Sequence, residues 1–121
     1  MTWRAWWPPV AWAVCILVAT WIPGAMVPRI PAPDGTDKLV HFLFFVVLGF
    51  LIQRALHVQG SAVVTLYAIL ALAAFGALDE FVQQFIPGRD MELFDWIADV
   101  SGAIVGVVIA RLTLERRAAR S

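Results

Sequence analysis

The sequence predicts an all-α fold, an integral membrane bundle of four transmembrane helices with both termini in the cytoplasm. Of its 121 residues, 61% are apolar or aromatic and only 15% are charged. That charged fraction is about 10 percentage points below the value usual in soluble domains. Apolar stretches long enough for a membrane-spanning helix of about 20 residues recur along the chain. Composition and apolar stretches together exclude a soluble globular domain and an intrinsically disordered chain.

Charge and cysteine content exclude further classes of protein. Nine Lys and Arg balance nine Asp and Glu, so the chain lacks the basic field that would bind nucleic acid. Cys15 is the only cysteine, which excludes a disulfide scaffold and a zinc finger. We therefore expect one membrane domain over residues 1–121, with no nucleic-acid partner and no cofactor.

Proline, glycine and capping residues set the expected bounds of the four helices. Pro8 and Pro9 suit a first turn, and Pro23 with the following glycine ends that helix. A cleaved signal peptide is the alternative for this segment, but no small-x-small cleavage site follows it. Thr36 or Asp37 is the expected cap of the second helix. The predicted helices cover about residues 9–27, 37–56, 61–85 and 93–112, followed by a basic cytoplasmic tail at 113–121.

The distribution of cations predicts the orientation of these helices. Six cations fall on the side that holds the termini and three on the other, so the positive-inside rule places both termini in the cytoplasm. Eight of the nine acids then lie on the outer side. We expect the functional face to be extracytoplasmic, with the protein in a bacterial inner membrane.

The second and third predicted helices each carry a polar face. Asp37, Lys38 and His41 lie on one flank of a helix. In one interpretation, Asp37 caps the helix, Lys38 snorkels toward the headgroups and His41 forms a hydrogen bond to a neighbouring helix. In the other, His41 carries a proton or binds a ligand. Glu80, Gln83 and Gln84 share a face at the outer end of the third helix. Asp79, beside them, is interpreted as solvated at the interface.

The loop and the fourth predicted helix add further ionisable groups. Arg89 either forms a structural ion pair with Glu80, Asp95 or Asp99, or binds an anionic ligand. We expect it to pair with one of these carboxylates. Asp95 complements the helix N-terminus, and the deeper Asp99 pairs with Arg89, His41 or Lys38. His41, Glu80, Asp95 and Asp99 also allow a divalent-metal site, which is the least favoured hypothesis because no compact ligand motif is present.

These residues form three ordered motifs between Asp37 and Arg111. They read Asp37-Lys38-x-x-His41-Phe42, Glu80-x-x-Gln83-x-Phe85-x-Pro87-Gly88-Arg89 and Asp95-x-x-x-Asp99-x-x-Gly102-Ala103-x-x-Gly106. In order, spacing and apolar setting they resemble the VanZ-like family. The resemblance implies a small integral membrane protein of a family named after a member associated with low-level resistance to the glycopeptide teicoplanin. Asp99 departs from the resemblance, because many members have Asn there.

Two functions remain open from the sequence. In the first, an outward-facing polar pocket binds an amphiphilic or anionic cell-envelope molecule, such as a membrane lipid or a lipid-linked molecule. If the protein is an enzyme, the same pocket also modifies that molecule. The groups assigned to chemistry are His41 as proton carrier with Glu80 and Asp99; those assigned to binding are Asp37, Lys38, Gln83, Arg89 and Asp95. In the second, the protein is a non-catalytic assembly protein that recruits a partner through Gly102 and Gly106, although these glycines are foremost packing residues.

Overall fold

A computed structural model describes residues 3–27, 31–56 and 61–121 of the chain. In these ranges the fold is all-helical, which confirms the predicted class. The helices are α1 (Trp3–Trp21), α2 (Thr36–Leu56), α3 (Ala62–Gln83) and α4 (Leu93–Arg120), with a short 3-10 helix, η1 (Gly24–Met26), after α1.

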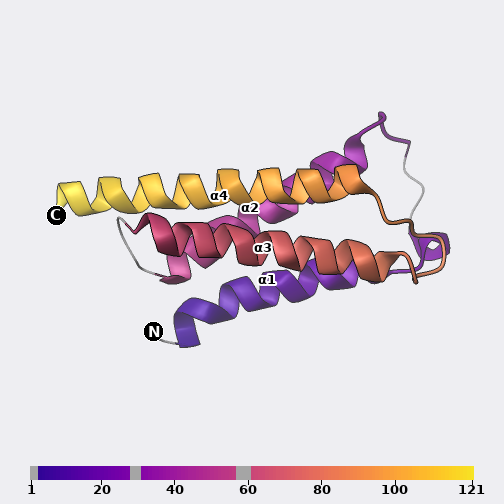
Figure 1. Cartoon of the computed structure of the whole chain (residues 1–121), viewed down its shortest axis with the longest axis horizontal. Helices are drawn as coiled ribbons and strands as arrows, with labels where there is room; N and C mark the ends of the chain where they lie inside the picture. The colour runs from indigo at the N-terminus through magenta and orange to yellow at the C-terminus, as the bar shows by residue number, and fades with distance from the viewer. Residues whose placement is uncertain (1–2, 28–30, 57–60) are drawn as a thin grey trace.

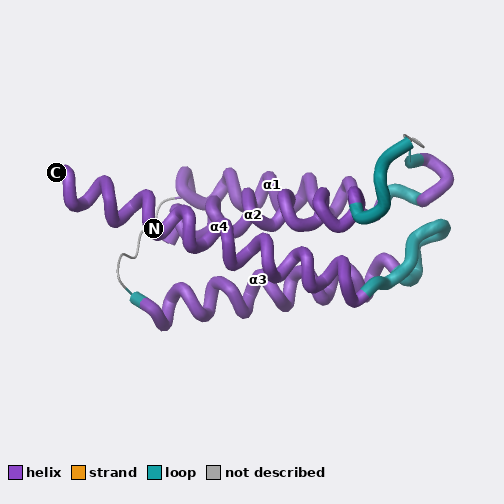
Figure 2. The backbone as a smooth tube through the Cα atoms, turned by 90° about the horizontal axis from the view of Figure 1, so that it is seen from above, coloured by secondary structure: helices purple, strands orange, loops and turns teal. Residues whose placement is uncertain are grey.

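The four long helices lie side by side along one axis (Figures 1 and 2). The chain ends at the same end of the bundle at which it begins, and the α1–α2 and α3–α4 connections lie together at the opposite end. We call the latter the connection end. The most extensive helix pairing is between α2 and α4, which places the first polar motif of the sequence against the third.

Three of the helices, α2, α3 and α4, are long and apolar enough to cross a membrane. Large aliphatic side chains are exposed along them, including Leu39, Val47, Leu70, Val108 and Ile109. Such a surface suits lipid rather than water. The chain is accordingly a multi-pass membrane protein. Helix α1, which contains two prolines and several tryptophans, does not meet the same hydropathy criterion.

The bounds of α1 and α4 differ from those predicted. Helix α1 begins at Trp3 rather than near residue 9, so Pro8 and Pro9 lie inside it rather than in its first turn. Prolines inside a helix remove backbone hydrogen bonds and bend it, and the start of α1 bends away from the rest of the helix (Figure 1). Helix α4 continues to Arg120, because the basic segment after residue 112 contains no glycine or proline to end it.

Glycines allow α2 and α4 to approach each other closely. A Cβ atom at Gly102 would collide with the backbone carbonyl of Phe42, and one at Gly106 with the carbonyl of Val46. Both neighbours are backbone atoms of α2 that no side-chain rotation can move. The small-residue face of α4 is therefore covered by α2 of the same chain, as the packing interpretation predicts, and does not form a free surface for a partner.

The bundle has a small apolar core in its middle and tryptophan hydrogen bonds between its helices. The core cluster comprises Ile16, Phe45, Leu48, Leu72, Ala103 and Val107. The indole N–H of Trp12 donates to the Phe44 carbonyl over 2.9 Å, which ties α1 to α2. The indole of Trp96 donates to the Ala73 carbonyl over 2.9 Å, which ties α4 to α3. This apolar region separates the connection end from the basic C-terminal end of α4.

Candidate functional site

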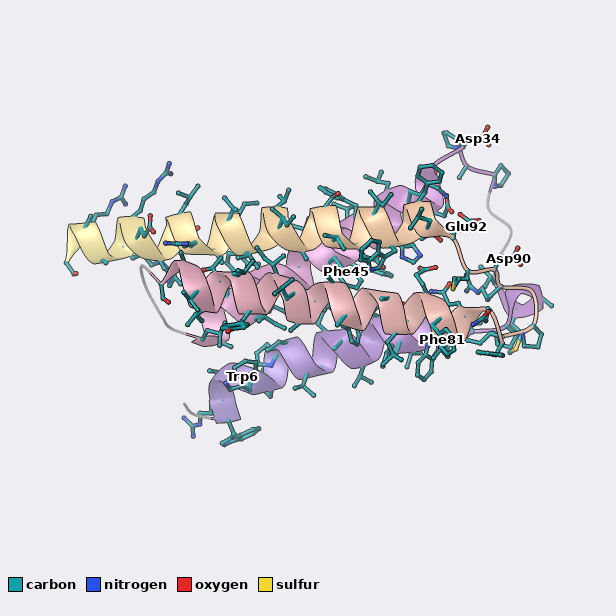
Figure 3. The ribbon with its side chains drawn as sticks, in the orientation of Figure 1. Trp6, Asp34, Phe45, Phe81, Asp90 and Glu92 are labelled. Atoms are coloured by element: carbon teal, nitrogen blue, oxygen red, sulfur yellow. The ribbon has the colours of Figure 1, made fainter. Side chains whose placement is uncertain are left out.

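Buried polar side chains gather at the connection end of the bundle. Figure 3 shows that Asp90 and Glu92 lie at this end, whereas Trp6 lies toward the opposite one. The group that we call the polar cluster combines six buried side chains with the mostly buried His41: Thr20, Asp79, Glu80, Gln83, Asp95 and Asp99. Burial of so many ionisable groups is costly, and each needs polar partners.

His41 is the point at which three helices meet. Its Nδ1 atom lies 2.9 Å from Oδ1 of Asp99 on α4. The same nitrogen is 3.7 Å from Oε1 of Glu80 on α3, and Nε2 is 3.7 Å from Oδ2 of Asp95. The pairing of Asp99 with His41 is one of the partners predicted from the sequence.

Lys38 pairs with three acids at the rim, of which Asp95 also belongs to the polar cluster. Its Nζ atom lies 2.8 Å from Glu92, 3.1 Å from Asp37 and 3.2 Å from Asp95. An ammonium group has three N–H donors, and all three have a carboxylate partner here. Lys38 therefore joins the start of α2 to the start of α4 and has no donor left for a ligand.

Asp79 is buried, so the interpretation that it is solvated at the interface is wrong. Its side chain is 1% exposed, and Oδ1 accepts hydrogen bonds of 2.8 Å from both the Thr20 hydroxyl and the Trp21 indole of α1. These two donors were missed at the sequence level. The available signal was the spacing of four residues between Asp79 and Gln83, which places Asp79 on the polar face of α3.

Glu80 and Gln83 share a buried face of α3, as predicted, and Gln84 does not. The Gln83 amide donates to Oε1 of Glu80 over 3.3 Å and to Oδ2 of Asp79 over 3.4 Å. The other oxygen of Glu80 accepts a 3.2 Å bond from the backbone N–H of Glu92 at the start of α4. Gln84 is exposed because α3 ends at Gln83. The amide and the backbone bond hold the Glu80 carboxylate in place.

The predicted pairing of Arg89 with Glu80, Asp95 or Asp99 is wrong. Arg89 instead donates from Nε to the Ile22 carbonyl over 2.9 Å and from Nη2 to the Ala19 carbonyl over 3.2 Å. Carbonyls in the last turn of a helix lack intrahelical partners and form the negative end of its dipole. Arg89 therefore stabilises the end of α1 and, within the described ranges, forms no ion pair.

A close backbone contact explains why Arg89 reaches α1. The N–H of Gly24 donates to the Pro87 carbonyl over 2.8 Å, which brings the turn after α3 against the end of α1. Gly88 adopts a positive φ of 75° in this turn, a conformation that favours glycine. The sequence shows the Pro87-Gly88 turn but not the element against which it packs.

A pocket opens between the end of α1 and the start of α2. Its volume is about 220 Å³, and it is lined by Ala19, Thr20, Asp37, Val40, His41, Phe44 and Arg89. Its lining combines apolar side chains with a guanidinium, a hydroxyl, an imidazole and a carboxylate, so the pocket suits a molecule that has both apolar and charged parts.

Two groups of side chains in or beside the polar cluster have metal-ligand spacing. The first consists of His41, Glu80 and Asp95, and the second of Asp37, Glu92 and Asp95; in each, the ligand atoms lie within 4.8 Å of one another. The second group surrounds the Lys38 ammonium.

Comparisons with known proteins place the chain in a family. No solved structure matches it. It is 32% identical over 91 residues to an uncharacterised protein of the fission yeast Schizosaccharomyces pombe, a match that covers 74% of this chain and 55% of that protein. The chain thus spans about half the length of this relative. The family model described as VanZ/LLP1 matches residues 3–114. The chain, with its polar motifs gathered at one end of a helical bundle, belongs to the VanZ/LLP1 family.

Proposed function

We propose that this protein binds an amphiphilic molecule with an anionic headgroup in the pocket between α1 and α2. The observation that carries the proposal is the composition of the pocket wall. Val40 and Phe44 supply part of the apolar lining, and they lie on a helix that is apolar enough to cross a membrane. Arg89, Thr20 and His41 supply polar contacts within the same 220 Å³. A lipid that enters from the bilayer meets both kinds of wall.

Arg89 is the residue best suited to hold the anionic part. A guanidinium has five N–H donors, and Arg89 uses two of them on the carbonyls of Ile22 and Ala19. The remaining donors are available to a phosphate or carboxylate. Lys38, which the sequence also predicts to bind the ligand, is committed to three carboxylates. Anion binding therefore depends on Arg89.

The orientation of the bundle belongs to the same proposal. Six cations on the terminal side and three on the connection side favour cytoplasmic termini and an extracytoplasmic pocket, with α1 as a fourth crossing helix. The exposed residues of α1 support its contact with lipid, since Val10, Val14 and Val18 form an apolar stripe. The ligand is then a membrane lipid or a lipid-linked cell-envelope molecule. The link of the family name to teicoplanin resistance is consistent with an envelope ligand.

The alternative of an assembly protein has less support. It assigns partner recruitment to Gly102 and Gly106, and α2 covers both.

Native mass spectrometry of the purified full-length protein tests the proposal. After incubation with equal amounts of phosphatidylglycerol and phosphatidylcholine, we expect the wild type to retain phosphatidylglycerol preferentially. Arg89→Ala removes the free donors, and Val40→Phe enlarges an apolar lining side chain without changing charge; both variants should lose most of the bound lipid. Arg89→Lys, which keeps a cation, should lose less than Arg89→Ala.

Arg54→Ala is the matched control, because Arg54 is an exposed arginine at the opposite end of the bundle. It should leave lipid retention unchanged. Equal retention by the wild type, Arg89→Ala and Val40→Phe would contradict the proposal.

A further inference from the structure

Three metal-binding side chains converge from three different helices inside the polar cluster. His41 comes from α2, Glu80 from α3 and Asp95 from α4. We propose that these three side chains bind a divalent metal cation of the Mn²⁺ or Zn²⁺ type. The sequence shows no compact ligand motif because the three residues come together only when the helices pack.

The spacing of the ligand atoms suits one cation. The imidazole and the two carboxylates offer atoms within 4.8 Å of one another. His41 Nε2 and Asp95 Oδ2 are separated by 3.7 Å. Two ligands that each lie about 2.1 Å from a metal are roughly 3 to 4 Å apart. One nitrogen and two carboxylate oxygens form a donor set that Zn²⁺ and Mn²⁺ accept.

Asp99 orients the imidazole for this role. Its carboxylate lies 2.9 Å from His41 Nδ1, so the proton of the neutral ring belongs on Nδ1 and the lone pair on Nε2. A histidine that binds metal through one nitrogen commonly donates its other N–H to a carboxylate, which sets its tautomer and orientation. Nε2 is also the nitrogen nearer to Asp95, whereas the Glu80 carboxylate lies 3.7 Å from Nδ1 and must turn toward Nε2 to complete the site. Asp99 is therefore a positioning residue.

The charge of the cluster supports a cation independently. Four carboxylates, those of Asp79, Glu80, Asp95 and Asp99, are at most 6% exposed. Within the described ranges, two basic side chains lie at ion-pair distance from these four carboxylates. They are His41 and Lys38, and of the four Lys38 reaches Asp95 alone. Oδ2 of Asp99 is buried with no hydrogen-bond partner among those residues. Burial of this many carboxylates is costly unless they are protonated or a cation lies among them, and a bound divalent cation supplies that counter-charge.

The position of the Lys38 ammonium distinguishes the two groups that have metal-ligand spacing. The Lys38 ammonium contacts all three members of the group formed by Asp37, Glu92 and Asp95, so that group already has its cation. No lysine or arginine of the described ranges lies within ion-pair distance of Glu80. A metal on Nε2 occupies the lone pair that would otherwise take up a second proton, so this assignment replaces the proton-carrier role of His41 predicted from the sequence.

Electron paramagnetic resonance with Mn²⁺ as the probe tests the inference directly. The full-length protein is treated with chelator, placed in nanodiscs of neutral phosphatidylcholine and titrated with Mn²⁺. We expect one saturable site per chain, from which Zn²⁺ displaces Mn²⁺. His41→Gln and Glu80→Gln should each weaken Mn²⁺ binding by at least about tenfold.

Asp90→Asn is the matched control. Asp90 is an exposed acid at the same end of the bundle, so this change removes one negative charge near the site but no ligand. It should alter the affinity by less than about twofold, because exposed charges are well screened. Circular dichroism confirms that each variant is folded.

Absence of a saturable site in the wild type would overturn the inference whatever the variants show. Equal affinity in the wild type, His41→Gln and Glu80→Gln would also overturn it, as would an equal loss in Asp90→Asn. Because phosphatidylcholine has no net charge and the readout is the metal, the result is independent of anionic lipid binding in the pocket.

Discussion

The Nδ1 atom of His41 lies 2.9 Å from the Oδ1 atom of Asp99, a contact between residues 58 positions apart in the chain. It joins α2 to α4 inside the polar cluster. Asp99 is fully buried, and Gly76 of α3 faces it: a Cβ atom at Gly76 would lie only 3.1 Å from Oδ2. The lack of a side chain at Gly76 therefore lets α3 pack over the carboxylate, which has no exposure to solvent.

The first prediction concerns Asp99→Asn. The amide keeps an oxygen that accepts a hydrogen bond from His41 but removes a buried charge. We expect the free energy of unfolding in metal-free nanodiscs to stay equal or rise by about 1 kcal/mol, because a buried carboxylate costs more than a buried amide. The Mn²⁺ affinity should fall by about 10- to 100-fold, since a weaker acceptor orients the imidazole less well. Thermal unfolding and the Mn²⁺ titration measure the two effects separately; a large loss of stability without metal would refute this role for Asp99.

The second prediction concerns Thr20→Val. The substitution preserves shape and removes the hydroxyl that donates to buried Asp79 over 2.8 Å. Leaving a buried carboxylate short of one donor should destabilise the protein by about 1–3 kcal/mol. Thr113→Val is the matched control, because the Thr113 hydroxyl bonds only its own helix and is exposed. The control should change the free energy of unfolding by less than about 0.5 kcal/mol. Equal effects of the two variants would contradict the conclusion that the hydrogen bond from Thr20 to Asp79 holds α1 against α3.

The third prediction concerns Gly106→Ala. The new Cβ atom would meet the Val46 carbonyl and would lie 2.9 Å from the Phe50 nitrogen, both in the backbone of α2. Since α2 would have to move away from α4, we expect a loss of about 1–3 kcal/mol. Ser101→Ala, at an exposed position of the same helix, should be neutral within about 0.5 kcal/mol. Denaturant unfolding of both variants provides the comparison, and a neutral Gly106→Ala would mean that the two helices are not held at this distance.

The fourth prediction concerns orientation. In a Cys15→Ala background, a cysteine introduced at Asp90 should react with membrane-impermeant maleimide applied from outside the cell, and one introduced at Arg116 should not. The expectation follows from the excess of cations at the terminal end. The reverse labelling pattern would place the polar cluster on the cytoplasmic side.

Much of the fold follows from local sequence. Apolar composition and Pro-Gly breaks are properties of single segments, and they predict α2 and α3 to within a few residues. The face shared by Glu80 and Gln83 follows from helical periodicity alone. The pairing of Asp99 with His41 could be predicted as one of several, because a deep carboxylate needs a polar partner and the chain offers few.

The amino-acid sequence by itself thus determined the helices, their apolar surfaces and the set of polar residues that must meet away from lipid. Only the tertiary structure decided which of those residues meet. Arg89 binds carbonyls in and just after the last turn of α1 rather than a carboxylate, and Asp79 is buried against Thr20, because the turn after α3 packs on the end of α1. The reason is physical: helix formation and membrane partitioning depend on neighbouring residues in the chain, whereas the partner of a buried charge depends on which helix end packs beside it.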